Sequence, residues 1–259
     1  MKISVFRKLL YLFQNRGCIK QMQTAGGYSF GTEIVMSLPS LNSKLGSEEI
    51  SGIVSESASC GPVTAHLPFY GLDFSCPDEH IAEYSRSVVK QAVDLCHKAG
   101  ISKGVCHTGF SPLLPEKAIY KWFDLFFEAK KEIEDYAGKR DVSVLWENTH
   151  ETHIDVFREI IKENPETLIC LDTGHVNCFA DFSMKEFTEE FSDSIVHAHI
   201  HDNNGKEDSH SALGSGNMDF KEISELLNST NAEVCVCELY DDDLKHSMPV
   251  LKKYFFETL

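Results

Sequence analysis

The sequence predicts an α/β fold made of one closed barrel of eight β/α units, a (β/α)8 barrel. Short apolar or β-branched segments alternate with longer segments of helical period along the whole chain. The 259 residues, 42% of them hydrophobic, suffice for one large core. No Pro/Gly/Ser-rich linker, charge block or short-period repeat divides the chain, so we expect residues 1–259 to form one domain.

Eight segments have the length and the apolar or β-branched content of buried strands. In chain order they are Ile3–Phe6, Thr32–Met36, Val63–His66, Gly104–His107, Val142–Glu147, Leu168–Asp172, Ile195–Ile200 and Glu233–Glu238. Parallel neighbours need crossover connections, and closure leaves no exposed strand edge. Eight such strands with helices between them therefore favour a closed parallel barrel.

Six segments between the strands have the period of an amphipathic helix. Pro77–Ala99 and Ala118–Tyr136 are the clearest, because Gly100 and Gly138 follow them as stop signals. The weaker helices are Asp155–Lys162, Met184–Phe191, Phe220–Leu227 and Asp243–Phe255. The helix expected within residues 7–30 is short or broken, because three glycines interrupt it: Gly17, Gly26 and Gly27.

The formal net charge of -16 is unevenly distributed. Residues 1–44 carry six basic residues against Glu33 alone, a local balance of +5 that leaves -21 for the rest of the chain. One interpretation is an acidic protein whose first helix is basic. The other is a basic rim beside an active site, which would matter for a polyanionic substrate.

The N-terminal segment and the cysteines both predict a cytoplasmic protein. Arg7 and Lys8 interrupt the first apolar stretch and no small-residue cleavage site follows, which argues against an export signal. No apolar run reaches the ~18 residues that a membrane-spanning helix needs. The nine cysteines form no CxxC motif, so we expect mostly buried thiols in a reducing compartment.

Nine residues of metal-ligand type recur along the chain, most of them at the carboxyl ends of predicted strands: His66, His107, Glu147, Asp172, His175, His199, Asp208, His210 and Glu238. In a barrel these strand ends share one face, which carries the chemistry. Alternation along the seventh strand places three histidines on the inner face, His197, His199 and His201, and three apolar residues on the outer face, Val196, Ala198 and Ile200. The sequence therefore predicts a metal centre at the barrel mouth.

Histidine and carboxylate donors suit zinc, manganese, cobalt or iron, and the lack of thiolates argues against a closed structural zinc site. Asp172 and His175 are separated by a glycine turn, so both can reach one ion. Asp208 and His210 lie in a polar loop whose glycines leave it flexible enough to fold back over the mouth.

Other residues near the mouth are expected to orient ligands or contact substrate: His150, His153, His197 and His201. Phe69 and Tyr70 are either a substrate wall or ordinary packing.

Six short motifs follow in order: Thr64-Ala-His-Leu-Pro-Phe, Val105-Cys-His-Thr-Gly, Trp146-Glu-Asn-Thr, Leu171-Asp-Thr-Gly-His-Val-Asn, His199-Ile-His-Asp-Asn and Asp208-Ser-His. As a set they resemble the xylose isomerase-like TIM-barrel superfamily, from about residue 32 to the end of the chain. That superfamily includes sugar isomerases and epimerases and the endonuclease IV family of abasic-site nucleases. The resemblance implies a single TIM barrel.

The resemblance to the epimerase branch implies one divalent ion, manganese, cobalt or magnesium, held by Glu147, Asp172, His199 and Glu238. Glu147 and Glu238 would also move a proton on and off the carbon beside the carbonyl of a sugar or sugar-like polyol, through a metal-stabilised enediolate. Many ketose epimerases carry an arginine shortly after the histidine of strand seven. It has no counterpart in residues 201–206, so the particular sugar stays open.

The resemblance to the endonuclease branch implies three zinc ions bound by all nine residues, with a metal-bridging hydroxide that attacks phosphorus. Four carboxylates with one divalent ion leave a charge of about -2, which suits a neutral sugar, whereas three ions leave about +2, which attracts a phosphodiester. The loops after His66 and Asp172 differ from the nuclease pattern, and the acidic body would repel DNA.

We therefore expect an isomerase or epimerase of a small molecule, with no membrane partner and an undetermined oligomeric state. The alternative is a zinc-dependent phosphodiesterase resembling endonuclease IV, for which nucleic acid would be the partner. A third possibility is a barrel that binds metal and ligand without turnover.

Overall fold

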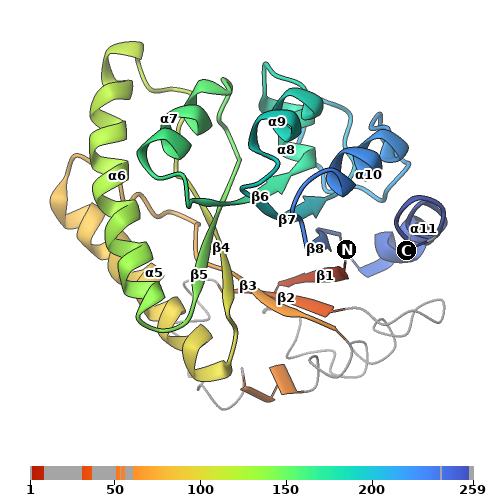
Figure 1. Ribbon diagram of the computed structural model, residues 1–259, viewed down its shortest axis with the longest axis horizontal. Helices are drawn as coiled ribbons and strands as arrows, with labels where there is room; N and C mark the ends of the chain where they lie inside the picture. Colours follow the sequence, from red (N-terminus) through yellow and green to blue (C-terminus); the bar gives the residue numbers. More distant parts are fainter. Residues whose placement is uncertain are drawn as a thin grey trace.

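The computed structural model describes residues 2–8, 31–36, 51–52, 54–55, 61–239 and 241–256. Eight parallel strands close into a barrel in chain order, and β1 pairs with both β2 and β8 (Figure 1). The predicted (β/α)8 fold is confirmed. The strands are β1 (Lys2–Lys8), β2 (Gly31–Val35), β3 (Val63–His66), β4 (Lys103–His107), β5 (Ser143–Glu147), β6 (Leu168–Asp172), β7 (Ile195–Ile200) and β8 (Val234–Cys237).

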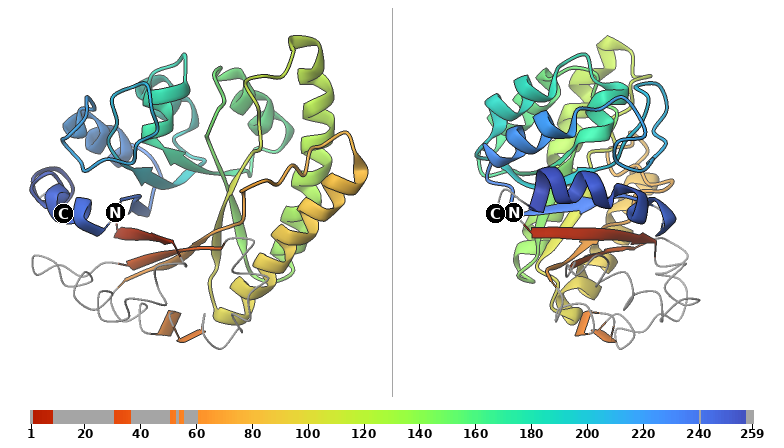
Figure 2. Two further views of the ribbon diagram at one scale, coloured as in Figure 1. Left: turned by 180° about the vertical axis from the view of Figure 1, so that it is seen from behind. Right: turned by 90° about the vertical axis from the view of Figure 1, so that its right-hand side faces the viewer.

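Helices follow the strands from β3 onward and lie on the outside of the barrel (Figure 2). They are α5 (Glu79–Ala99), α6 (Glu116–Gly138), α7 (Asp155–Glu163), α8 (Thr173–Phe179), α9 (Met184–Phe191), α10 (Phe220–Asn228) and α11 (Asp241–Leu251), which continues as the π-helix η2 (Lys252–Phe256). The Asp78 carboxylate accepts the His80 N–H and starts α5, and Gly100, at φ 75°, ends it.

Three local predictions were wrong. The segment after Asp172 is the helix α8 rather than a turn, because the Asp172 carboxylate accepts the His175 N–H at 2.7 Å and caps it. The β6–β7 register shifts between Ile169 and Cys170, and Val196 packs against the interior cluster instead of facing outward with Ala198. The last predicted helix gives way to η2 soon after Pro249, which has no N–H to donate.

The main apolar core lies between the strands and the helices. Trp146 of β5 meets Phe126 of α6 edge-on with ring centroids 5.2 Å apart, and Phe126 stacks on Trp122 at 4.7 Å. Trp146 Nε1–H also donates to Glu134 at 2.8 Å. Since side chains alternate along a strand, Trp146 faces this layer while Glu147 faces the barrel axis.

A smaller apolar cluster of Val105, Leu145 and Cys170 fills the barrel interior below the polar strand ends. Seven cysteines of the described residues are free, and five of these are buried, as expected for structural thiols. Within the described residues, no helix combines the length and apolarity needed to cross a membrane. The predicted helix within residues 7–30 lies outside the described residues except at its first two positions, and most of the basic segment 1–44 does too.

Candidate metal centre

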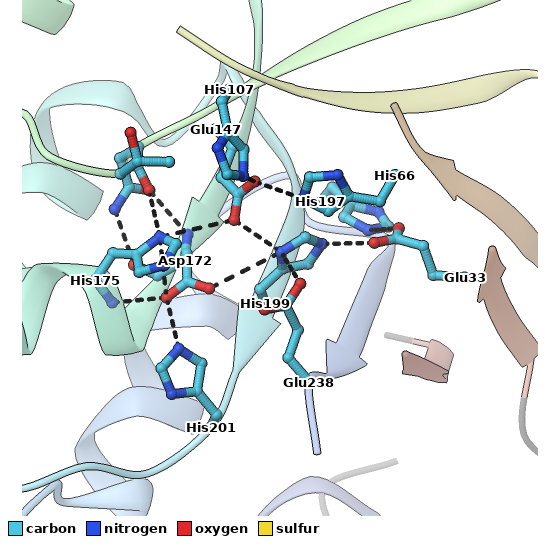
Figure 3. Close-up of polar contacts among 12 residues, drawn as sticks. Glu33, His66, His107, Glu147, Asp172, His175, His197, His199, His201 and Glu238 are labelled. Carbon is cyan, nitrogen blue, oxygen red and sulfur yellow. Dashed lines mark hydrogen bonds and ion pairs between the residues drawn. The ribbon is translucent and has the colours of Figure 1, made fainter. Parts of the chain in front are cut away.

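The nine predicted ligands converge at the carboxyl ends of the strands, and Figure 3 shows most of them pointing toward one another. Strand register places two pairs directly opposite each other. His107 of β4 is the partner of Glu147 on β5, and Asp172 of β6 is the partner of His199 on β7. The parallel register of the barrel therefore creates the cluster.

Four residues form what we call the central group: Glu147, Asp172, His199 and Glu238. His199 Nδ1 lies 3.0 Å from Glu147 Oε1, 2.9 Å from Glu238 Oε1 and 3.9 Å from Asp172 Oδ2. One imidazole proton can bond to only one of these three oxygens. The buried Asp172 Oδ2 and Glu238 Oε1 have no hydrogen-bond partner, so a cation at this point would satisfy atoms that the protein leaves unsatisfied.

The second carboxylate oxygen of Glu147 contacts two further histidines. Glu147 Oε2 lies 3.1 Å from His66 Nε2 and 3.1 Å from His107 Nε2. Burial acts to raise the pKa of Glu147, but His199 and His107 outweigh it and hold the pKa well below its usual range. Glu147 therefore links the central group to the His66 and His107 pair as a carboxylate.

Four further residues form what we call the outer group: His175, His201, Asp208 and His210. Asp208 Oδ2 lies 3.4 Å from His175 Nε2 and 3.1 Å from His210 Nε2, while its Oδ1 lies 3.4 Å from His201 Nε2. His210 has a positive φ of 46°, a strained conformation for a residue other than glycine. Its Nδ1 lies 3.4 Å from Glu238 Oε2, which joins the outer group to the central one.

Exposure increases from the central group outward. His66 and His199 are buried, whereas the side chains of His107, Asp208 and His210 are 22%, 28% and 27% exposed. The cluster therefore opens to solvent on the side of these three residues, where a small molecule could enter.

The second nitrogen of several histidines is fixed by the protein. His66 Nδ1 bonds to the Leu67 carbonyl at 3.0 Å, His175 Nδ1 to the Asn148 carbonyl at 2.8 Å, and His210 Nδ1 to the Glu238 carbonyl at 3.1 Å. A carbonyl can only accept, so each Nδ1 carries a proton and each Nε2 faces the carboxylates of the cluster, where it can bind a metal ion once it is deprotonated. Histidines that bind metal in proteins are usually held in this way.

The donor set fits a divalent metal. Burial acts to raise the pKa of Asp172, but His175 and His201 lower it to about 2, so this carboxylate is ionised at neutral pH. Imidazole and carboxylate donors without thiolate suit zinc, manganese or cobalt. Glu147, Asp172, His199 and Glu238 would hold one such ion, and the outer group supplies the donors for another.

The other predicted residues separate into two sets. His197 and His201 are fully buried, with His197 below His199 on β7 and His201 against Asp172 at 3.3 Å. Phe69 stacks on the His107 ring at 4.3 Å, and the neighbouring Tyr70 is 76% exposed at the rim.

The remaining two histidines are exposed, and His150 is near enough to His175 and Asp208 to interact with both electrostatically. His150 is exposed and meets Phe179 edge-on, with ring centroids 4.6 Å apart. His153 is exposed and lies 3.5 Å from Asp181, so the structure does not bring it into the cluster.

Three contributors were missed by the sequence predictions. Glu33 of β2 is fully buried and contacts His199 from the barrel interior. The Asn148 side chain bonds to both the N–H and the carbonyl of Asp172. Asp202 Oδ2 accepts the Gly214 and Gly216 N–H groups at 2.9 and 2.8 Å, so it pins the loop that follows the outer group. An acid inside an apolar strand was the available signal for Glu33.

Gly174 of α8 occupies a position where a side chain has no room. A Cβ there would lie 2.0 Å from Cε1 of His201, whose ring is held between Asp172 and Asp208. Gly174→Ala is expected to displace this ring, to cost about 1–3 kcal/mol of stability and to weaken metal binding by the outer group. Thermal unfolding and metal analysis of the purified variant measure both effects.

Gly138→Ala is the matched control, because no atom lies within 4 Å of the added Cβ at the end of α6. It is expected to keep the wild-type metal content and to raise stability slightly. If Gly174→Ala has the same melting temperature and metal content as this control, the close packing of α8 against His201 does not matter.

Comparison with known proteins finds relatives in sequence and solved structures of the same fold. The protein MJ1614 of Methanocaldococcus jannaschii is 29% identical over 199 residues, which are 73% of this chain and 76% of that one. The TTHB071 protein of Thermus thermophilus, solved after soaking with ZnCl2, has a TM-score of 0.82 at 22% identity over 99% of both chains. A D-tagatose 3-epimerase-like protein has a TM-score of 0.79 at 23% identity over 99% of this chain and 98% of that one.

Other structures of similar fold bear the names of sugar epimerases, among them a D-psicose 3-epimerase and an L-ribulose 3-epimerase. The family model described as xylose isomerase-like TIM barrel matches residues 30–254. This chain belongs to the xylose isomerase-like TIM-barrel family.

Proposed function

We propose that the protein is a divalent-metal-dependent isomerase or epimerase of a sugar or sugar-like polyol. The observation that carries the proposal is the pair Glu147 and Glu238, whose Oε1 atoms lie 3.0 and 2.9 Å from the same nitrogen of His199. Two carboxylates in one buried site can remove a proton from a carbon and return one to it. The epimerase names of structures with this fold support the same reaction class.

Glu147 ends β5 and Glu238 follows β8, so the two carboxylates enter the site from different parts of the barrel. The ionised carboxylate of one glutamate accepts the proton from the carbon beside the carbonyl. The protonated carboxyl group of the other glutamate returns a proton to that carbon. When bound, a divalent ion polarises the substrate carbonyl and offsets the negative charge that develops on its oxygen. Phe69 and Tyr70 offer an aromatic wall at the rim for the apolar face of a sugar.

A zinc-dependent phosphodiesterase is the second candidate, and one observation favours it. Glu147 Oε2 is shared by His66 and His107, and the outer group adds a further set of donors, so the nine residues offer places for more than one ion. Glu33 adds a fifth carboxylate to the earlier charge count. The formal charge of the site is then about +1 with three divalent ions and about -3 with one ion. Both values are less favourable for a phosphodiester than the earlier ones.

Solvent hydrogen exchange tests the proposed reaction. Metal-free protein is loaded separately with Mn²⁺, Co²⁺, Mg²⁺ or Zn²⁺ and incubated with a panel of ketoses in ²H₂O. We expect deuterium at the carbon beside the carbonyl, together with a new epimer or isomer, detected by NMR. His153→Gln is the matched control and should keep full exchange, since His153 lies exposed beside Asp181.

The variant Asp208→Asn/His210→Gln separates the two candidate functions. The epimerase proposal predicts a modest fall in exchange, because these residues touch the central group only through Glu238. The phosphodiesterase predicts about three zinc ions in the wild type, fewer ions in the variant, and cleavage of an abasic-site duplex. Metal-loaded wild type that exchanges no sugar proton but cleaves this duplex would rule out our proposal.

We also place the protein in the cytoplasm, with a small-molecule substrate and without a nucleic-acid partner. The free and mostly buried cysteines of the described residues support a reducing compartment.

A further inference from the structure

Glu33 is a fully buried carboxylate that the proposed reaction does not use. It lies on β2, and Figure 3 shows its carboxylate directed at His199. Its Oε2 accepts the Thr64 hydroxyl at 2.7 Å and bonds to His197 Nε2 at 3.0 Å. Its Oε1 lies 3.0 Å from His199 Nε2.

A buried carboxylate is costly unless a cation or several donors compensate for its lost hydration. Among the described residues, the ion-pair partners of Glu33 are the two histidines and no lysine or arginine. The two imidazoles of β7, each 3.0 Å from a Glu33 oxygen, are therefore the groups that compensate for its burial.

The two oxygens of Glu33 are used differently. Thr64 and His197 both bond to Oε2 and fix the carboxylate from the side, because Glu33 and Thr64 are register partners on β2 and β3. This leaves Oε1 directed at His199. Oε1 has no hydrogen-bond partner among the described residues, and its ion-pair contact is His199 Nε2 at 3.0 Å.

His199 has two ring nitrogens with opposite surroundings. Nδ1 faces the carboxylates of Glu147 and Glu238, and Nε2 faces Glu33. His66, His175 and His210 each place their second nitrogen against a neutral backbone carbonyl. His199 Nε2 has a closer carboxylate, at 3.0 Å, than His210 Nδ1 at 3.4 Å or His175 Nδ1 at 3.7 Å.

We propose that Glu33 is a positioning residue for the metal centre: it keeps a proton on His199 Nε2 and thereby presents Nδ1 as a strongly basic ligand. A carboxylate stabilises the Nε2–H tautomer and increases the electron density on the other nitrogen more than a carbonyl does. The proposal rests on the proposed function, since it assumes that the central group binds a divalent ion.

Cobalt binding tests the role of Glu33 without relying on turnover. Glu33→Gln keeps the shape and an acceptor oxygen but removes the charge. We expect the variant to bind Co²⁺ about 10- to 100-fold more weakly than the wild type and to show an altered visible absorption spectrum. Thr64→Val is the matched control, because it removes a bond to Oε2 and leaves the Oε1–His199 contact, and we expect its affinity to fall less than about 3-fold.

Nitrogen-15 NMR of the zinc-loaded wild type gives an independent measurement that does not require a variant to fold. We expect the His199 spectrum to show a protonated Nε2 and a metal-bound Nδ1. A metal-bound Nε2 would overturn the role of Glu33, and so would Glu33→Gln with wild-type Co²⁺ affinity and spectrum. A wild type that binds neither ion would overturn the proposed function as well.

Discussion

Glu147→Gln is expected to remove most of the bound metal and to lower kcat/KM by on the order of 10³-fold. The substitution keeps the size of the side chain but replaces one oxygen by an NH₂ group. That group would face either His199 Nδ1 or the Nε2 atoms of His66 and His107, which now meet a donor where they had a carboxylate. Removing one partner from a buried charged cluster also costs about 3–5 kcal/mol.

Metal analysis, steady-state kinetics and thermal unfolding of Glu147→Gln measure the three effects. Glu233→Gln is the matched control, because its side chain is 72% exposed and pairs with Lys103 at the surface. Exposed ion pairs contribute about 0–1 kcal/mol, so this variant should resemble the wild type. A Glu147→Gln protein with full metal content would mean that Glu147 does not bind the ion.

Removal of metal by a chelator is expected to lower the melting temperature by on the order of 10 °C and to abolish activity. An ion present at 100 to 1,000 times its Kd adds about 3–4 kcal/mol to stability. In a chain of this size each kcal/mol corresponds to about 2–4 °C. Adding the ion back should restore both quantities, and a melting temperature insensitive to chelation would argue against a bound metal.

The effect of chelation should depend on pH. Burial acts to lower the pKa of His210, but Asp208 and Glu238 outweigh it and raise the pKa to about 9. In the metal-free protein, His210 therefore contributes stability that is fully present below its unfolded pKa of about 6.5 and is lost as pH rises through 9. Chelation should lower the melting temperature less at pH 6 than at pH 9, and an equal loss at both would contradict this assignment.

The barrel was predictable because apolar residues recur at a different spacing in its strands than in its helices. This difference is present in every β/α unit from β3 to β8. The ligand set was predictable for a related reason. Donor residues at the carboxyl ends of parallel strands must meet at one face, so the positions of His66, Glu147 and Glu238 along the chain implied their proximity. Whether they bind metal in this protein stays a prediction.

The details that sequence reasoning missed depend on contacts between distant segments. Glu33 and His197 are 164 positions apart and meet only across the closed barrel. The direction of a loop was equally hidden, since His153 follows a strand end as closely as several ligands do but turns outward to Asp181. The segment after Asp172 reads locally as a turn, and the capping bond from His175 made it a helix.

The two tryptophans of the chain lie together in the layer between β5 and α6, both against Phe126. Trp146 adjoins Glu147 in sequence but faces the opposite side of the strand. Tryptophan fluorescence therefore reports whether the layer between β5 and α6, directly behind the metal centre, is folded. Cobalt absorption reports whether the centre itself holds its ion. Two optical signals from adjacent residues can distinguish a variant that has lost its ion from one that has lost its fold.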